Sequence, residues 1–262
     1  MRDGVETYRA SDGAELAFRD EGPHGLGIPL LLVHGWQADG TVWGALVACL
    51  REHHRVITVD LRGAGASSAA PGPYDLDKYS NDLTELIPSL DLDPVVVVGH
   101  SMGAAIAQRF AIDNPEAVEG LVLIAPVPAS GMPMSAKTLE MFRGLPGNAE
   151  KTAAWLKLLT LREPATEVTK LLRDAAAGIR PDVALQAFES WQSANFANEA
   201  ATIETPTLIL APSGDRPEFA REKVADIIAG SRFEVLSEVG HYAPLERPNA
   251  IATRIEEFLA EL

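Results

Sequence analysis

The chain has 262 residues, of which 47% are hydrophobic, and a formal net charge of −15 at pH 7. This length fits one α/β domain with a large core, and the acidic balance disfavours nucleic acids and anionic membrane surfaces as partners. No apolar run approaches the length of a membrane span. The start of the chain lacks the apolar stretch of a secretion signal, and Cys49 is the single cysteine. We therefore expect the protein to be located in the reducing cytoplasm.

Short apolar strands alternate with helical patterns along most of the chain. The turn at Asp12-Gly13 predicts an opening hairpin. The later runs do not alternate with polar residues, which is typical of strands buried on both faces of a parallel sheet. The pattern therefore predicts the α/β class, with a mostly parallel central sheet and helices on both faces. We place the strands at residues 6–11, 15–20, 30–33, 56–60, 95–98, 121–125, 207–211 and 233–236.

Residues 128–203 interrupt this alternation. They contain only helical patterns separated by Pro and Gly, at residues 135–143, 149–161, 165–177 and 182–197. An all-helical insertion between two strands indicates a helical cap, or lid, over a core formed by residues 1–127 and 204–262. An ordinary helical layer of the core is the alternative. The cap is favoured because the insertion follows a strand whose carboxyl end should border a crevice.

Gly99-His100-Ser101-Met102-Gly103 is the most informative segment, because it joins a run of four valines to an amphipathic helix. Gly-X-Ser-X-Gly alone is a weak signal that also fits a glycine-rich turn with a solvent-facing serine. The strand–turn–helix setting favours a tight turn with Ser101 at its tip and small residues on either side. The amide of Met102 then lies at the positive end of the helix, where an oxyanion is stabilised.

A serine nucleophile needs a base and a group that orients the base. Among six histidines, His241 lies on a loop after the last predicted strand, whereas the side chain of His100 should point elsewhere. Asp215 follows the preceding strand, and the chain order of serine, aspartate and histidine is the one expected with this turn. Glu218 and Asp226 are competitors for the role of the acid.

His34-Gly35-Trp36-Gln37 follows the predicted strand at residues 30–33. Gly35 allows the backbone to turn, so that the amide of Trp36 would join the amide of Met102 in an oxyanion hole. For His34 we favour a structural histidine bonded to neighbouring backbone over a catalytic one.

From Leu30 to the C-terminal helix, the chain resembles the α/β-hydrolase-fold serine hydrolases. By this resemblance the fold is the α/β-hydrolase fold, and the stretch at residues 60–67 is mainly structural. The resemblance rests on His34-Gly35-Trp36, Trp43, Asp60-Leu61-Arg62-Gly63-Ala64-Gly65-Ala66-Ser67, Gly99-His100-Ser101-Met102-Gly103, Asp215, and His241 through Glu246-Arg247-Pro248.

The resemblance implies that Ser101 is the nucleophile, His241 the general base and Asp215 the residue that orients it. The backbone of Trp36 and Met102 supplies the oxyanion donors. A serine at the turn excludes the members that use an aspartate nucleophile. Some relatives carry the acid after the strand at residues 121–125, but this chain has Ala-Pro-Val-Pro at residues 125–128, which supports Asp215.

We predict hydrolysis of a carboxylic ester, thioester or lactone through an acyl-enzyme, without metal or cofactor. The substrate is expected to be a small molecule with an apolar acyl group. The alternatives are a C–C bond hydrolase that uses Arg143, Arg162 or Arg180, a non-hydrolytic lyase, cyclase or cofactor-free oxygenase, and a ligand sensor. The candidate pocket residues are Trp36, Met132, Met134, Trp155, Phe188, Trp191 and Phe196.

Overall fold

The computed structural model describes residues 4–92, 94–161, 166–215 and 222–262. Eight strands form one sheet in the order β1-β2-β4-β3-β5-β6-β7-β8. The opening hairpin of β1 and β2 is antiparallel, and every pairing from β4 to β8 is parallel. The strands are β1 (Glu6–Arg9), β2 (Glu15–Glu21), β3 (Leu30–Val33), β4 (Val56–Val59), β5 (Val95–His100), β6 (Val118–Ile124), β7 (Thr207–Pro212) and β8 (Arg232–Leu236).

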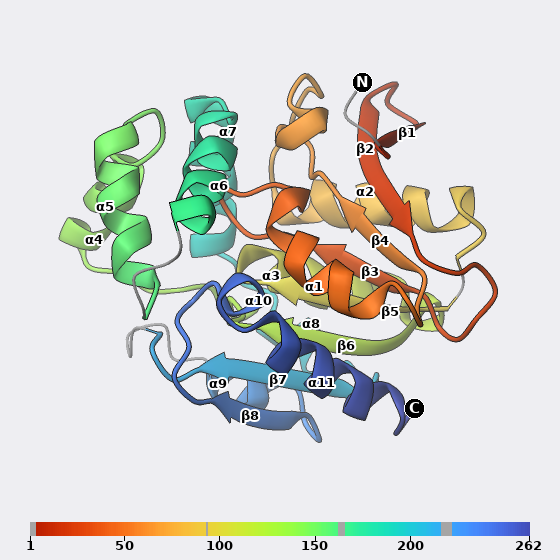
Figure 1. The fold of residues 1–262 in the computed structure, drawn as a ribbon. Helices are drawn as coiled ribbons and strands as arrows, with labels where there is room; N and C mark the ends of the chain where they lie inside the picture. Colours follow the sequence, from red (N-terminus) through yellow and green to blue (C-terminus); the bar gives the residue numbers. More distant parts are fainter. Residues whose placement is uncertain (1–3, 93, 162–165, 216–221) are drawn as a thin grey trace.

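Helices cover both faces of this sheet (Figure 1). One face carries α1 (Gly44–Leu50), α10 (Ala243–Glu246) and α11 (Pro248–Leu259), which contact one another. The other face carries α2 (Leu76–Ser89), α3 (Met102–Asp113), α8 (Ala197–Ala200) and α9 (Glu222–Ile227). Short 3₁₀ helices lie at η1 (Gly40–Trp43), η2 (Gly65–Ser67) and η3 (Pro115–Ala117). The predicted α/β layering is confirmed.

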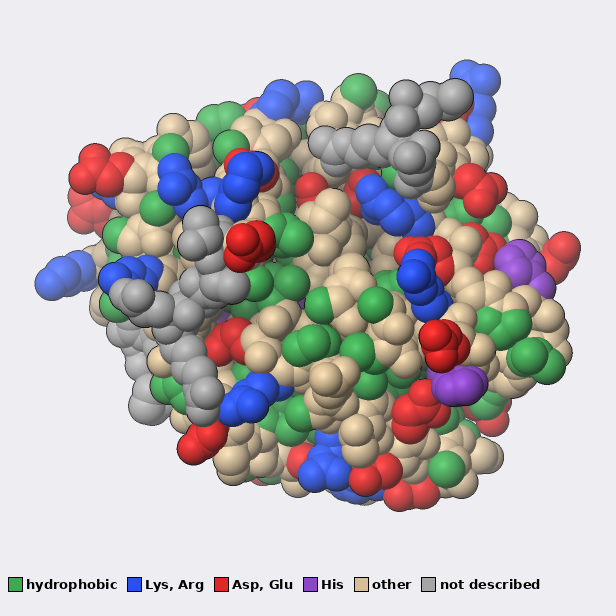
Figure 2. Space-filling model, viewed as in Figure 1, with side chains coloured by type: hydrophobic (Ala, Val, Ile, Leu, Met, Phe, Trp, Pro, Cys, Tyr) green, Lys and Arg blue, Asp and Glu red, His purple; other side chains and the backbone are tan. Residues whose placement is uncertain are grey.

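The central strands are buried along their whole length, as the unbroken apolar runs predict. Every residue of β3, β4 and β5 is buried, whereas the edge strand β8 alternates between partly buried and exposed positions. The outer surface in Figure 2 carries acidic and basic side chains interspersed with hydrophobic ones. None of the described helices is both long enough and apolar enough to cross a bilayer.

Four more helices lie beside the carboxyl ends of the parallel strands (Figure 1). Together with α8, they fill the described part of the chain between β6 and β7, where no strand is found. This placement is the one expected of a cap, and the division of the chain into core and cap stays a prediction. The helices are α4 (Ala136–Arg143), α5 (Ala149–Leu159), α6 (Thr166–Ala177) and α7 (Pro181–Gln192).

The prediction of one continuous helix at residues 182–197 is wrong, because the chain leaves the helix after Gln192 and forms α8 separately. The intervening backbone bonds to the segment that follows β6. The amide of Met132 donates to the carbonyl oxygen of Gln192 at 3.0 Å, and the amide of Phe196 donates to Ala129 at 2.9 Å. These bonds join the beginning and the end of the helical insertion.

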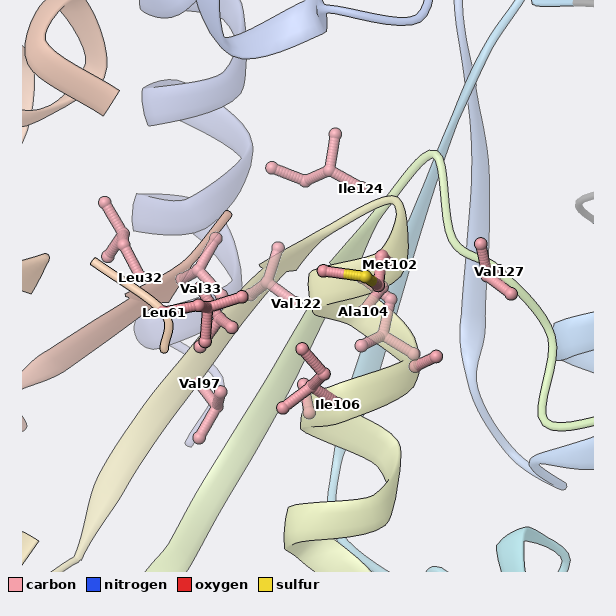
Figure 3. Close-up of a cluster of buried hydrophobic side chains, with 14 of the residues drawn as sticks. Leu32, Val33, Leu61, Val97, Met102, Ala104, Ile106, Val122, Ile124 and Val127 are labelled. Atoms are coloured by element: carbon pink, nitrogen blue, oxygen red, sulfur yellow. The ribbon is translucent and has the colours of Figure 1, made fainter. Parts of the chain in front are cut away.

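The turn from β5 into α3 depends on two glycines that allow backbone segments to approach closely. Ser101 has φ 55° and ψ −116°, a left-handed conformation that is rare for a residue with a side chain. A Cβ at Gly99 would lie 2.5 Å from the carbonyl oxygen of Gly103. A Cβ at Gly103 would lie 2.1 Å from the carbonyl oxygen of Val33 in β3. The small side chains that follow let α3 pack against the strands, as Ala104 does in Figure 3.

His34 lies at the end of β3 and is 1% exposed. Its Nε2 atom lies 3.0 Å from the backbone nitrogen of Leu61, and its Nδ1 atom lies 2.9 Å from the carbonyl oxygen of Gly35. An amide can only donate, so Nε2 accepts and Nδ1–H donates to the carbonyl. Both ring nitrogens are therefore hydrogen-bonded to backbone groups, which is the structural role expected for this histidine. Burial lowers the pKa of the imidazole below its ordinary value of 6.5.

Replacing Gly103 by Ala should destabilise the fold, because the added methyl group meets a backbone oxygen that cannot move independently. We expect a loss of about 1–3 kcal/mol in the free energy of unfolding, measured by urea denaturation. Gly44 is the control, since its Cβ would meet nothing within 4 Å and its φ is −52°. Gly44→Ala should be neutral or stabilising by up to about 1 kcal/mol. An unchanged midpoint for Gly103→Ala would contradict the packing argument.

The buried imidazole of His34 should make stability depend on pH. Because its pKa is lowered in the fold, the unfolded chain binds the proton more tightly. The stabilisation is present above about pH 6.5 and is lost as the pH falls toward the folded pKa. Thermal unfolding between pH 7.5 and 5.5 should therefore show a smaller loss of Tm for His34→Gln than for the wild type. The exposed His53→Gln should keep the wild-type slope, and equal slopes for all three proteins would refute the assignment.

Candidate active site

The candidate residues lie on loops at one edge of the sheet. Trp36, Ser101, Asp215 and His241 follow β3, β5, β7 and β8 respectively. All four strands run parallel, so their carboxyl ends meet at the same edge. Residues far apart in the sequence are therefore brought together by the order of the strands.

His241 pairs with Asp215. The distance from Nδ1 to Oδ2 is 3.2 Å, and the two side chains are 8% and 3% exposed. Because the carboxylate accepts, Nδ1 carries the proton and Nε2 is the basic nitrogen of the neutral ring. Of the competing acids, Asp226 lies exposed on α9, and Glu218 lies outside the described residues.

Ser101 and His241 line a common cavity of about 40 Å³. Four of the predicted pocket residues, Trp36, Met132, Trp155 and Trp191, line it as well. The cavity walls are otherwise apolar or aromatic and include side chains that the sequence analysis did not single out, namely Val127, Phe142, Leu159 and Tyr242.

Phe188 does not line this cavity, because other rings cover it. Its ring stacks on Phe142 at a centroid distance of 5.2 Å and contacts Trp36 and Trp191 at 5.6 and 5.1 Å. It is completely buried one layer behind the cavity wall. Which aromatic ring of a helix in the insertion reaches the cavity depends on how the helices pack, and periodicity alone does not reveal it.

Two more predicted pocket residues also lie away from the cavity wall. Met134 packs, partly buried, against the core, and Phe196 lies beneath the guanidinium of Arg109, which is 5.8 Å from the ring centroid. Met134 lies two residues after Met132, and Phe196 itself donates one of the two backbone bonds that join the ends of the insertion. Their packing explains their apolar character without a substrate.

Two backbone amides near Ser101 have no acceptor in the described part of the chain, those of Trp36 and Met102. Met102 is the first residue of α3, so its amide lies at the positive end of that helix. The loop that carries Trp36 passes close to the serine, since a Cβ at Gly35 would lie 3.1 Å from the Cβ of Ser101. The two amides that the sequence analysis selected are thus on segments adjacent to the serine.

Two helices of the insertion hold the loops of this site through backbone carbonyl groups. The indole N–H of Trp36 donates to the carbonyl oxygen of Ala184 in α7 at 2.7 Å. The backbone N–H of His241 donates to the carbonyl oxygen of Leu159 at the end of α5, also at 2.7 Å. Leu159 is the last residue of α5. The helix therefore ends two residues before residue 161, where the sequence predicted its end.

His100 contacts His241, in contrast to the expectation that its side chain points elsewhere. Its Nε2 atom lies 2.8 Å from the backbone carbonyl oxygen of His241, and the two ring centroids are 4.9 Å apart. Since a carbonyl only accepts, Nε2–H of His100 donates. Through this bond the side chain supports the loop that carries His241.

The arginines considered for a C–C bond hydrolase have other partners. Arg143 pairs with Glu189, and Arg180 pairs with Asp182 and with the hydroxyl of Tyr74. Neither lines the cavity of Ser101. Arg162 lies outside the described residues. Over the described ranges, no group of three or more His, Cys, Asp or Glu side chains is arranged to hold a metal ion.

Comparisons with known proteins identify chains that are similar to this one. The chain is similar to solved esterases from Exiguobacterium antarcticum, with a TM-score of 0.89 and 23% identity over 97% of this chain and 98% of that one, and from Thermogutta terrifontis, with a TM-score of 0.82 and 28% identity over 98% of each. It is 25% identical to a non-heme chloroperoxidase of Kitasatospora aureofaciens over 88% of this chain and 90% of that protein.

The chain spans about half the length of the uncharacterized Mycobacterium relatives that it matches at 32% identity: the match covers 65% of this chain and 48% of those proteins. Residues 30–254 match the family described as the alpha/beta hydrolase family. This match includes the strands of the parallel sheet and all four loops of the candidate site. The predicted fold is confirmed, and the chain belongs to the alpha/beta hydrolase family.

Proposed function

We propose that this protein is a serine hydrolase that cleaves a carboxylic ester, thioester or lactone through an acyl-enzyme on Ser101. The observation that carries the proposal is the pairing of His241 with Asp215 beside a strained serine, with Ser101 and His241 lining one cavity. A buried carboxylate on Nδ1 makes Nε2 the proton acceptor, which is the arrangement that activates a serine hydroxyl.

The reaction follows from these groups. Ser101 Oγ attacks the carbonyl carbon while His241 Nε2 takes the hydroxyl proton, and Asp215 stabilises the imidazolium. The amides of Trp36 and Met102 donate to the oxyanion of the tetrahedral intermediate. When this intermediate collapses, the alcohol or thiol leaves with the proton from His241. Water then attacks the acyl-enzyme by the same route and releases the acid and free Ser101.

The cavity favours a short, apolar acyl group. Its volume of about 40 Å³ is far below the roughly 300–1,000 Å³ of sites for drug-sized ligands. Its walls come from both the core and the helices at residues 128–203, which we interpret as a cap over the core of residues 1–127 and 204–262. The similarity to the Thermogutta terrifontis esterase supports ester hydrolysis over C–C bond cleavage. The bonds of Arg143 and Arg180 to other partners support it as well.

The proposal predicts turnover of p-nitrophenyl acetate, with kcat/KM falling as the acyl chain is lengthened. Ser101→Ala should lower kcat by about 10⁶-fold because the nucleophile is lost. Asp215→Asn should lower it by about 10⁴-fold because the ring loses its correct tautomer. A fluorophosphonate probe should label the wild type and not Ser101→Ala.

The exposed Ser237→Ala is the matched control and should keep both labelling and turnover. Labelling without turnover of any ester would favour a C–C bond hydrolase, a non-hydrolytic enzyme of the same fold, or a ligand sensor. Absence of labelling in the wild type would mean that Ser101 is not activated, and the proposed mechanism would then be wrong.

His100 should act as a positioning residue for His241. His100→Phe keeps a ring of similar size but removes the N–H donor to the His241 carbonyl, so we expect kcat to fall about tenfold with little change in KM. His100→Gln retains a donor and should recover most of the loss. A parallel rise in KM, or equal losses in both variants, would point to a general structural defect instead.

A further inference from the structure

Tyr242 lies directly after the proposed base and lines the cavity with Ser101. Its side chain is 6% exposed, and its ring centroid lies 5.4 Å from that of His241 and 5.5 Å from that of His100. The proposed mechanism gives this tyrosine no task. Among the cavity residues that the sequence analysis did not single out, Tyr242 is the one that carries a hydroxyl group.

The other polar side chains of the cavity already have a partner or are enclosed. The indole N–H of Trp36 is bonded to Ala184, and Trp155 has an interaction of its own. The indole nitrogen of Trp191 has no partner, but the surrounding atoms enclose it completely, and the ring of Phe188 lies edge-on to it at 5.1 Å. The indole N–H groups of Trp36 and Trp191 are therefore not available to a substrate.

The hydroxyl of Tyr242 differs from these groups. It has no hydrogen-bond partner within the described ranges, and it is not among the completely enclosed polar atoms, so it borders free space. Burial raises the pKa of the phenol, so the hydroxyl keeps its proton and can donate. A ligand that covers this hydroxyl must accept its hydrogen bond, because a buried donor without a partner is unfavourable.

We propose, on the basis of the proposed function, that Tyr242 determines specificity by donating a hydrogen bond to a second oxygen of the substrate, other than the scissile carbonyl. The substrate class is then a short ester whose acyl or alcohol part carries an ether, hydroxyl or keto oxygen. The hydroxyl of Tyr242 recognises this oxygen in a cavity that is otherwise apolar. A purely hydrocarbon ester fits the same space but leaves the hydroxyl without a partner.

The test compares Tyr242→Phe with the wild type on pairs of esters of equal size. For the acyl part, the pair is p-nitrophenyl methoxyacetate and p-nitrophenyl butyrate, and for the alcohol part it is 2-methoxyethyl acetate and n-butyl acetate. The variant loses only the hydroxyl oxygen. We expect kcat/KM to fall about tenfold on the oxygen-bearing member of one pair and to change less than about twofold on its hydrocarbon partner. The pair that responds identifies the part of the substrate that Tyr242 contacts.

Tyr79→Phe is the matched control, because Tyr79 is a buried tyrosine on α2 that does not line the cavity. It should leave all four rates unchanged. Equal rate changes within both pairs for Tyr242→Phe would overturn the inference. Fluorophosphonate labelling separates the two proposals: if both proteins are labelled at Ser101 and the pairs respond equally, the role of Tyr242 fails alone. If neither protein is labelled, the proposed function fails.

Discussion

The approach of α3 to the backbone of β3 at Gly103 is the contact on which the candidate site depends. It fixes the strained conformation of Ser101, places the helix terminus with the Met102 amide beside the serine, and brings the loop of Gly35 within contact of it. A side chain at Gly103 would separate the helix from the strand and move all three groups together. The geometry of the candidate nucleophile and of the two proposed oxyanion donors is therefore set by one backbone approach, and not by separate adjustments.

The parts of this protein that could be predicted from its sequence are those that local chemistry determines. Gly99 and Gly103 predict the turn because they leave room for neighbouring backbone, and the apolar runs predict buried strands because nothing polar alternates with them. Asp215 and His241 could be selected because both follow such runs, and parallel strands end at a common edge. The strand order places both loops at one edge of the sheet, where the two side chains pair.

The remaining features depend on how distant segments pack. Phe142 and Phe188 both occupy apolar faces of predicted helices, yet only Phe142 reaches the cavity, because α4 and α7 pack with Phe188 behind it. The position of His100 before the serine predicts only that its side chain points elsewhere, whereas the fold brings the loop after β8 against its imidazole. No sequence pattern indicates that the carbonyl groups of Leu159 and Ala184 accept hydrogen bonds from the loops of the site.

Because α5 and α7 hold these loops through main-chain carbonyl groups, a substitution on either helix leaves the acceptor oxygen itself in place. The side chains of the same helices that face the cavity can then change in size and polarity without removing either bond. The support of the loops that carry Trp36 and His241 can therefore be retained while the side chains that contact a substrate change. A chain built in this way can acquire new substrates through single changes in its helical insertion while the chemistry is retained.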